Sequence, residues 1–312
     1  MNKARCAVAL LITALSVTAI AENQTAAPPQ GGPPQPEFIQ QGNQLARDGK
    51  LQEALDLYQK HLSVPADTFA ANIASGNTLD LMGKGDEARK YFAKALEIAS
   101  TPQLTAQANR ATAMSYAFEG NCKKSVEYQQ KVFEYQRQQK DFFAQGEVAN
   151  EVARVCIDSG DLDASYQWYK TGHDVGLQEP NIKPDRVDLW NFRWEHAQAR
   201  IAARKGNKAE AEKHVAAAKA ILDKGTNPNQ VPFLPYLTGY VAFYTGDAKT
   251  ALAELQKANQ NDPFIQTLIG ETYEKLGDKA KAMEFFKKGS MTTAHNPAGA
   301  YAKRVTRNLK IG

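Results

Sequence analysis

The sequence predicts an all-α protein: a solenoid of helix–turn–helix repeats, about seven units long, followed by a C-terminal capping helix. Two observations carry this prediction. From Glu37 onward, apolar residues recur at steps of three and four, as on one face of an α-helix, and no sustained alternation of period two competes with them. Glycines also recur, at intervals of 34, 37, 40, 46, 40 and 31 residues. They are Gly49, Gly83, Gly120, Gly160, Gly206, Gly246 and Gly277.

Each of these glycines is expected to end the first helix of a pair, because glycine reaches left-handed backbone angles without a Cβ penalty. A small residue follows five positions later and lets the two helices approach closely. A large apolar residue often follows nine positions later, as Phe92 and Phe286 do. We expect this residue to fill the gap toward the neighbouring pair. An irregular helical bundle with chance glycines is the alternative. The small residues are Ala54, Ala88, Ser125, Ser165, Ala211, Ala251 and Ala282.

The N-terminus is expected to be removed or extended rather than folded. Residues 1–21 have a basic start, an apolar run and the small-residue end Ala19-Ile20-Ala21, which predicts a secretory signal peptide. An uncleaved anchor is the alternative, although the run is short for a span of about 20 apolar residues. Residues 22–36 hold 5 of the 14 prolines and predict a disordered linker. The array then covers residues 37–312.

The C-terminal helix is expected from about Pro297 to Leu309. It carries Lys303, Arg304 and Arg307. A repeat array needs a polar outer face at its end, so we expect these side chains to face solvent.

The composition excludes several classes of protein. A net charge of +4 over 312 residues is too small for a nucleic-acid binder, and three cysteines cannot build a disulfide-rich scaffold. After the predicted cleavage, Cys122 and Cys156 remain. Both are expected near the turn end of adjacent units, so we predict a structural disulfide between them; two buried thiols are the alternative.

Enzyme signatures are missing from the sequence. It contains no phosphate-binding G-x-x-x-x-G-K-[ST], no G-x-S-x-G, no H-E-x-x-H and no C-x-x-C, and its five histidines stand singly. We therefore expect no catalytic residue, no metal site and no cofactor. Glu147, Glu151 and Asp158 are carboxylates that a glycan-cleaving helical array would need close together. Their spacing does not distinguish them from surface residues.

Two stretches of the chain resemble the tetratricopeptide repeat (TPR) family, whose unit is a 34-residue helix–turn–helix. One reads Gly76-x2-Leu79-x3-Gly83-x4-Ala88-x3-Phe92-x2-Ala95, and the other reads Gly270-x2-Tyr273-x3-Gly277-x4-Ala282-x3-Phe286. The resemblance covers about 260 residues and weakens in the middle units. It implies a right-handed superhelix whose first helices line a concave face that binds a protein or peptide.

Candidate binding residues lie on the first helices, many of them six positions before a turn glycine. The asparagines partly fit the family's carboxylate-binding set, but Met114 and Ile39 do not, so that type of binding is not expected. Arginines beside tyrosines suit an extended peptide with some acidic character. Packing between helices is the alternative role for the aromatic residues. The candidates are Asn43, Asn77, Arg110, Asn150, Arg154, His196, Arg200, Tyr236, Tyr240 and Phe243.

The sequence thus favours a non-enzymatic exported scaffold that binds a partner protein or extended peptide, in envelope assembly or in the organisation of a protein complex. The expected location is the bacterial periplasm, with secretion second. We expect no nucleic-acid partner, and no stable membrane span after cleavage of the signal peptide. The alternatives are a helical-array enzyme acting on glycan or cell-wall material and a self-associating structural protein.

Overall fold

The computed structural model describes residues 35–309. The predicted signal peptide, most of the predicted linker and residues 310–312 lie outside the described residues. The described chain is all helical, with two short 3-10 turns, η1 (His61–Ser63) and η2 (Pro228–Gln230). Its α-helices are α1 (Glu37–Arg47), α2 (Leu51–Lys60), α3 (Thr68–Leu81), α4 (Gly85–Ile98), α5 (Pro102–Phe118), α6 (Cys122–Gln139), α7 (Phe142–Ser159), α8 (Leu162–Gly176), α9 (Pro184–Arg204), α10 (Lys208–Leu222), α11 (Phe233–Tyr244), α12 (Ala248–Leu255), α13 (Pro263–Lys275), α14 (Lys279–Ser290) and α15 (Pro297–Thr306).

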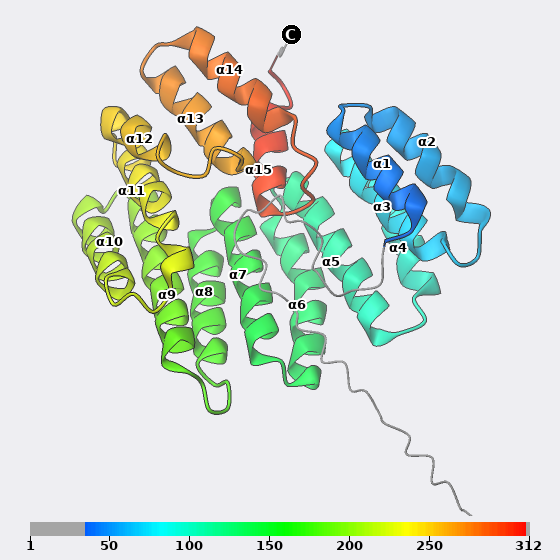
Figure 1. Ribbon diagram of the computed structural model, residues 1–312, viewed down its shortest axis with the longest axis horizontal. Coiled ribbons are helices and arrows are strands. Elements are labelled where there is room, and N and C mark those ends of the chain that lie inside the picture. Colours follow the sequence, from blue (N-terminus) through cyan, green and yellow to red (C-terminus); the bar gives the residue numbers. More distant parts are fainter. Residues whose placement is uncertain (1–34, 310–312) are drawn as a thin grey trace, which may run out of the picture.

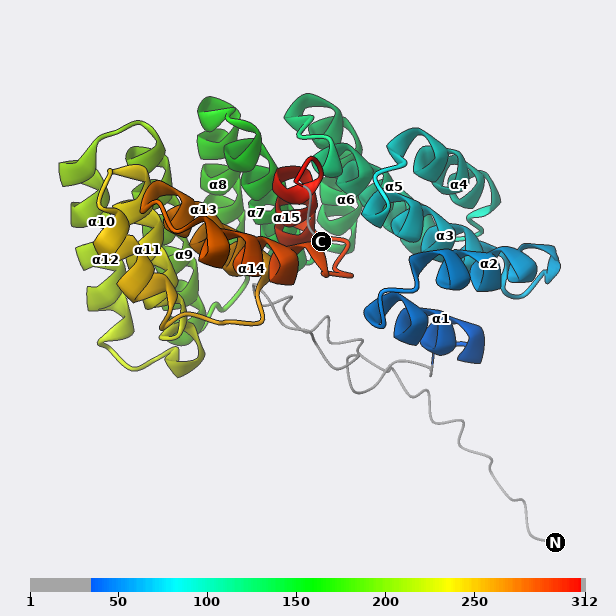
Figure 2. The same ribbon diagram turned by 90° about the horizontal axis from the view of Figure 1, so that it is seen from above.

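The helices pack as seven consecutive antiparallel pairs, from α1–α2 to α13–α14, followed by the single helix α15 (Figure 1). Each pair also packs against the next one, so the core runs along the array as a chain of local clusters. The predicted all-α solenoid is therefore confirmed. The array curves, and the last pair comes to lie across from the first pairs (Figure 2).

The turns inside the pairs follow from two residue types in succession. The seven predicted glycines all have left-handed backbone angles, with φ of +79° at Gly83 and +89° at Gly160. In the last five pairs the next residue is an Asn or Asp, and its side chain accepts a hydrogen bond from the backbone N–H three residues on, as Asn121 does from Lys124 and Asp161 from Ala164. Glycine therefore ends the first helix, and the polar residue after it begins the second.

The large residue nine positions after the glycine packs within its own pair as well as toward the neighbouring pair, where Phe92 shares a core cluster with Ala108 and Ala111 of α5. Phe92 is fully buried and its ring lies against Gly76, in the first helix of its own pair. Phe286 lies in the same way against Gly270, and Tyr58 against Gly42. The missing Cβ in the first helix makes room for the ring, so this contact holds the two helices of one pair together.

We expect Gly76→Ala to lower the free energy of unfolding by about 2 kcal/mol, the range observed when extra atoms are forced into a packed core. A Cβ at this position would lie 2.6 Å from Cζ of Phe92. Denaturant unfolding monitored by circular dichroism gives the change. The double variant Gly76→Ala/Phe92→Leu should lose less free energy of unfolding than the sum of the two single losses, because the smaller side chain relieves the clash. Strict additivity would contradict this packing.

A disulfide joins the third and fourth pairs. Sγ of Cys122, at the start of α6, is bonded to Sγ of Cys156, in the last turns of α7, at 2.08 Å. Val152 packs against both residues, and both are buried. The bond therefore fixes the position of α6 relative to α7 beside the turn at Gly120.

The C-terminal helix packs against the array, so of the three side chains expected to face solvent only Arg307 is exposed, while Lys303 and Arg304 are half-buried. α15 packs inside the curve of the array against α5, α7, α13 and α14 (Figures 1 and 2). Arg304 is half-buried and donates a hydrogen bond to the backbone oxygen of Asp158 at 2.6 Å, and the exposed Arg307, directly after the helix, donates one to that of Phe118 at 3.1 Å. Free carbonyl groups at the ends of α5 and α7 attract these cations. Backbone carbonyl groups are present in every residue, so the sequence does not indicate which of them bind a cation.

Candidate functional site

The first helices of the pairs line the inner side of the array. From the fourth pair onward, the positions six residues before the turn glycines are Arg154 on α7, Arg200 on α9, Tyr240 on α11 and Glu271 on α13. These side chains and their neighbours are directed toward the space beside α15. This is the surface on which the candidate site is assembled.

The charges of four arginines act on one carboxylate of this surface. Asp158 is half-buried, and the positive charges of Arg154, Arg200, Arg204 and Arg304 favour its ionised form and so lower its pKa. We call these four arginines and Asp158 the inner arginine cluster. They come from α7, α9 and α15, so helices far apart in the sequence supply them.

Tyrosines complete the cluster and fix its cations. Arg200 donates to the hydroxyl oxygen of Tyr169 at 2.6 Å and to that of Tyr236 at 3.4 Å. Arg204 lies over the ring of Tyr244, 4.7 Å from its centre, and donates to its hydroxyl oxygen at 3.4 Å. Guanidinium groups stack well on aromatic rings, so these contacts hold the arginines in place.

Burial and neighbouring charges have opposite effects on the pKa values of the titratable groups in this cluster. Burial raises the pKa of Asp158, and the four arginines oppose this rise. Burial also raises the pKa of Glu271, where the hydrogen bond from Tyr301 at 2.5 Å has the opposite effect. Burial alone would lower the pKa of Arg204, but Tyr240, Tyr244 and Asp158 more than reverse this. The cluster therefore carries an excess of positive charge.

The candidate residues with exposed surface are fewer than the sequence predicted. His196, Arg200, Tyr236, Tyr240 and Phe243 are all buried, at 5% exposure or less. The ring of His196 lies between Phe192 and Tyr236, and Phe243 is covered by Lys275, whose Nζ is 3.7 Å from the ring centre. An open groove across these five side chains is therefore wrong: the aromatic residues of α11 pack between helices.

The other candidates lie apart from one another. Asn43 accepts a hydrogen bond from Tyr58 of its own pair at 3.0 Å. Arg110 forms an ion pair with Glu151 at 3.0 Å. The side-chain oxygen of Asn150 lies beside Gly172 on α8, and Asn77 is half-buried on α3. Of the ten candidates, Arg154 alone is a half-buried member of the cluster.

Sequence reasoning left several members of the site out of its candidates. Arg204 and Tyr244 follow Arg200 and Tyr240 by one helical turn, so helical spacing contained a signal for them. Tyr169 belongs to a second helix, α8, and Tyr301 and Arg304 belong to α15. No periodicity along the chain could place these three.

The carboxylates considered for catalysis each face an arginine. Glu147 pairs with Arg193, Glu151 pairs with Arg110, and Asp158 belongs to the cluster. Among residues 35–309, no group of three or more His, Cys, Asp or Glu side chains could hold a metal ion. Across the same residues, none of the helices combines the length and the apolar character needed to cross a membrane.

The fold and this inner surface define a helical-repeat protein, and comparison with known proteins identifies two of its repeats. The model of the tetratricopeptide repeat matches residues 70–102 and 265–290. These two stretches are tetratricopeptide repeats. Proteins with these repeats are in general scaffolds for protein–protein interaction. No curated protein matches the sequence.

Solved structures with a similar arrangement have low sequence identity. A tetratricopeptide repeat protein from Parabacteroides merdae matches with a TM-score of 0.46 and 15% identity, over 87% of this chain and 98% of that one. A putative kinesin light chain from Podosopora anserina, with nearly identical TPR-like repeats, matches with a TM-score of 0.48 and 16% identity, over 60% of this chain and 94% of that one. The APC/C hetero-tetramer Cut9–Hcn1 matches with a TM-score of 0.43 and 15% identity, over 88% of this chain and 49% of that one.

Proposed function

We propose that this protein is an exported, non-enzymatic scaffold that binds a partner protein or an extended peptide on its inner surface. The observation that carries the proposal is the inner arginine cluster, in which the half-buried Arg204 and Arg304 and the buried Arg200 lie beside tyrosines. Arginine and tyrosine are the residue types that dominate binding energy at protein interfaces. The excess of positive charge favours a partner segment that carries acidic groups.

Two features of the chain support export as part of the proposal. The N-terminal 21 residues have the pattern of a secretory signal, and the cysteines that remain after it form a disulfide. Disulfides persist in oxidising compartments such as the bacterial periplasm. We propose the periplasm as the location, with secretion as the second candidate, and a role in envelope assembly or in organising a protein complex.

Replacing Arg154 and Arg204 together by alanine is expected to weaken partner capture by about 100-fold, since hydrogen bonds to charged groups contribute roughly 1.5–3 kcal/mol each. The protein as secreted is used to capture partners from the envelope fraction, and affinity is then measured by titration with the captured partner. The circular dichroism spectrum should keep its helical signal.

The matched control removes two positive charges from the outer side of the array. Lys213 and Lys219 on α10 are exposed, at 72% and 57% of their side chains. The variant Lys213→Ala/Lys219→Ala should capture the partner as the unaltered protein does. Equal capture by the Arg154/Arg204 variant would contradict the proposed site, and loss of capture in the control would indicate a general charge effect instead.

A further inference from the structure

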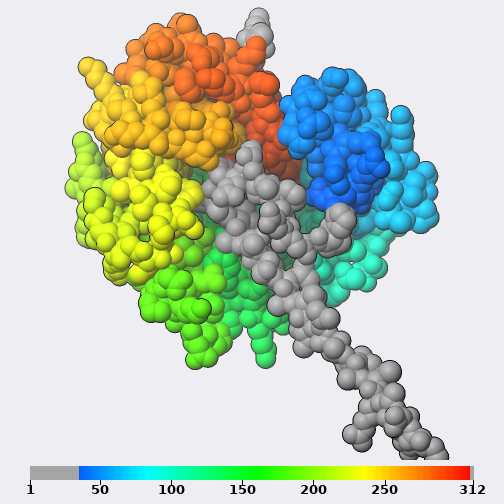
Figure 3. Space-filling view, viewed as in Figure 1, coloured from blue at the N-terminus to red at the C-terminus, as the bar shows by residue number. Residues whose placement is uncertain are grey.

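The last helix connects two distant parts of the array. α15 belongs to the C-terminal end of the chain, yet its approach segment reaches α3: Nε2 of His295 lies 2.8 Å from Oδ2 of Asp80. In the space-filling view, the C-terminal residues lie next to the N-terminal helices (Figure 3). This contact spans 215 positions of sequence. A chain of repeats that each contact only their neighbours would not make it.

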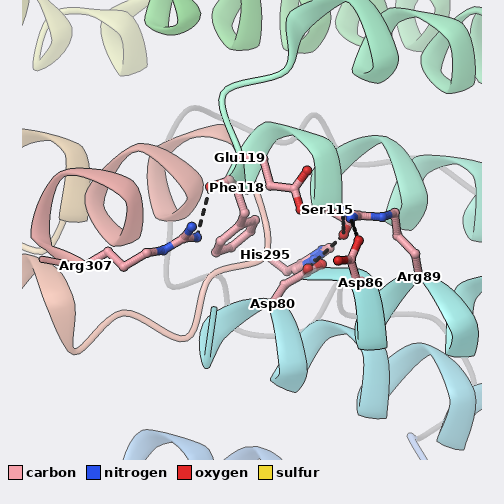
Figure 4. A network of polar contacts seen from close by, with 8 residues as sticks. All are labelled: Asp80, Asp86, Arg89, Ser115, Phe118, Glu119, His295 and Arg307. Atoms are coloured by element: carbon pink, nitrogen blue, oxygen red, sulfur yellow. Dashed lines mark hydrogen bonds and ion pairs between the residues drawn. The ribbon is translucent and has the colours of Figure 1, made fainter. Parts of the chain in front are cut away.

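The Asp80 contact belongs to a buried polar network (Figure 4). The Asp80 side chain has no exposed surface, and its Oδ1 accepts a hydrogen bond from Oγ of Ser115 at 2.8 Å. Ser115 in turn accepts one from Arg89 of α4 at 3.3 Å. The His295 ring stacks on Phe118 with a centre-to-centre distance of 5.2 Å. Three helices of the N-terminal half, α3, α4 and α5, therefore share in holding this histidine.

Two arginines of α15 bind the ends of first helices. Arg307 caps α5 at the oxygen of Phe118, and Arg304 caps α7 at the oxygen of Asp158. The turn glycine at 120 leaves room for the second: a Cβ there would lie 2.6 Å from Nη1 of Arg304. The C-terminal end of a helix carries partial negative charge, so these contacts are favourable.

The other side of α15 is attached to the seventh pair. Tyr301 donates its hydroxyl to Glu271 of α13, and its ring lies 4.3 Å from that of Phe264. Nζ of Lys303 donates to the backbone oxygen of Ser290 at the end of α14, at 2.6 Å. One helix thus bridges the second, third and fourth pairs to the seventh pair.

The composition of α15 distinguishes it from the pairs that it bridges. It has ten residues, fewer than an isolated helix needs to be stable in water. Apart from Tyr301, the side chains that it buries are small or of medium size: Pro297, Ala298, Ala300, Ala302 and Thr306. The segment 292–295 before it has no regular structure. Polar and helix-end contacts therefore contribute a large share of its attachment, and on its own side the Tyr301 ring is the one large apolar group that it buries.

We propose that α15 is a detachable strap. When docked, it holds the array closed across the inner side of α3, α5 and α7; when released, it opens this side without unfolding the pairs. The strap also supplies Arg304 to the inner arginine cluster. Its position would therefore control access to the surface that the proposed function uses, and in this respect alone it rests on that function.

Native-state hydrogen exchange of the unaltered protein tests the strap without any partner. The amides of α15 are expected to exchange at least about 100-fold faster than those of α5 and α7, because a strap opens locally whereas the pairs exchange through larger unfolding. Exchange of α15 at the rate of α5 and α7 would overturn the proposal, since α15 would then be released only with the whole fold. Because no partner is present, failure to find a binding partner leaves this result unaffected.

A pair of matched variants extends the test to the shape of the molecule. Arg304→Ala/Arg307→Ala removes both helix-end contacts, and Lys279→Ala/Lys281→Ala removes two charges from the exposed side of α14. The arginine variant should exchange its α15 amides at least about ten-fold faster again and show a larger radius of gyration by X-ray scattering. The lysine variant should match the unaltered protein in both. Faster exchange without expansion would overturn the closing role of α15.

Discussion

Removal of the disulfide between Cys122 and Cys156 is expected to lower the free energy of unfolding by about 4 kcal/mol. The bond closes a loop with a sequence separation of 34 residues, and the chain-entropy treatment of a cross-link gives this magnitude for such a loop. The bond restricts the unfolded chain, which loses less entropy on folding. Urea unfolding of the double variant Cys122→Ala/Cys156→Ala, compared with the unaltered protein, measures the loss.

Reductant supplies the control for this prediction. The unaltered protein should lose a similar amount of stability when dithiothreitol is present, whereas the double alanine variant should not respond to it. Alkylation without reductant should add no mass to the two cysteines of the oxidised protein. Two alkylated cysteines, or equal stability of the protein and the variant without reductant, would contradict the expected effect.

The second large effect is expected for His295→Ala, at about 3 kcal/mol. The substitution leaves the carboxylate of Asp80 buried with Ser115 as its remaining partner among the contacts described, and breaking a buried pair has a cost of this order. The loss cannot exceed the free energy of docking α15 by much, because release of the helix exposes Asp80 to water. Urea unfolding monitored by circular dichroism, together with exchange of the α15 amides, measures both quantities.

A double-mutant cycle separates this pair from general damage to the core. In Asp80→Ala/His295→Ala no buried carboxylate is left behind, so the double variant should be more stable than the sum of the two single losses predicts. Losses that simply add would show that the two side chains act independently. In that case the contact would not be what attaches the C-terminal segment to α3.

Local signals in the sequence were sufficient to predict the repeated pairs. A glycine turn followed by a small residue five positions later describes a contact within one pair, between residues close in the chain. The Asn or Asp directly after the glycine is an equally local signal for the start of the second helix. The contact of Phe92 with Gly76 was not predicted, because glycine differs from the residues around it only by the absence of a side chain.

The position of α15 could not be predicted from its own residues. Lys303, Arg304 and Arg307 have the composition of an exposed surface. Their partners are backbone oxygens at the ends of α5, α7 and α14, which every helix possesses and no residue type indicates. Only the curvature of the whole array brings these ends to α15.

The sequence indicated which helix faces converge at the candidate site but not how deeply their side chains are buried. Counting back from the turn glycines found the helix faces that converge, as Arg154 and Arg200 show. Arg200 is buried and contacts Tyr169 from the second helix of the neighbouring pair. The sequence around Arg200 does not indicate that this contact forms. Exposure decides between packing and binding, and it follows from tertiary contacts.

The contact between Asp80 and His295 also sets an order of events during folding. Each helical pair can form as soon as its own residues are available, because its contacts are local and such contacts form fast. The closing contact spans 215 positions, so it must wait until nearly the entire chain has emerged. Until then the acidic side chain at position 80 remains accessible to water, and the array is an open intermediate. The array closes only after the C-terminal segment has been synthesised.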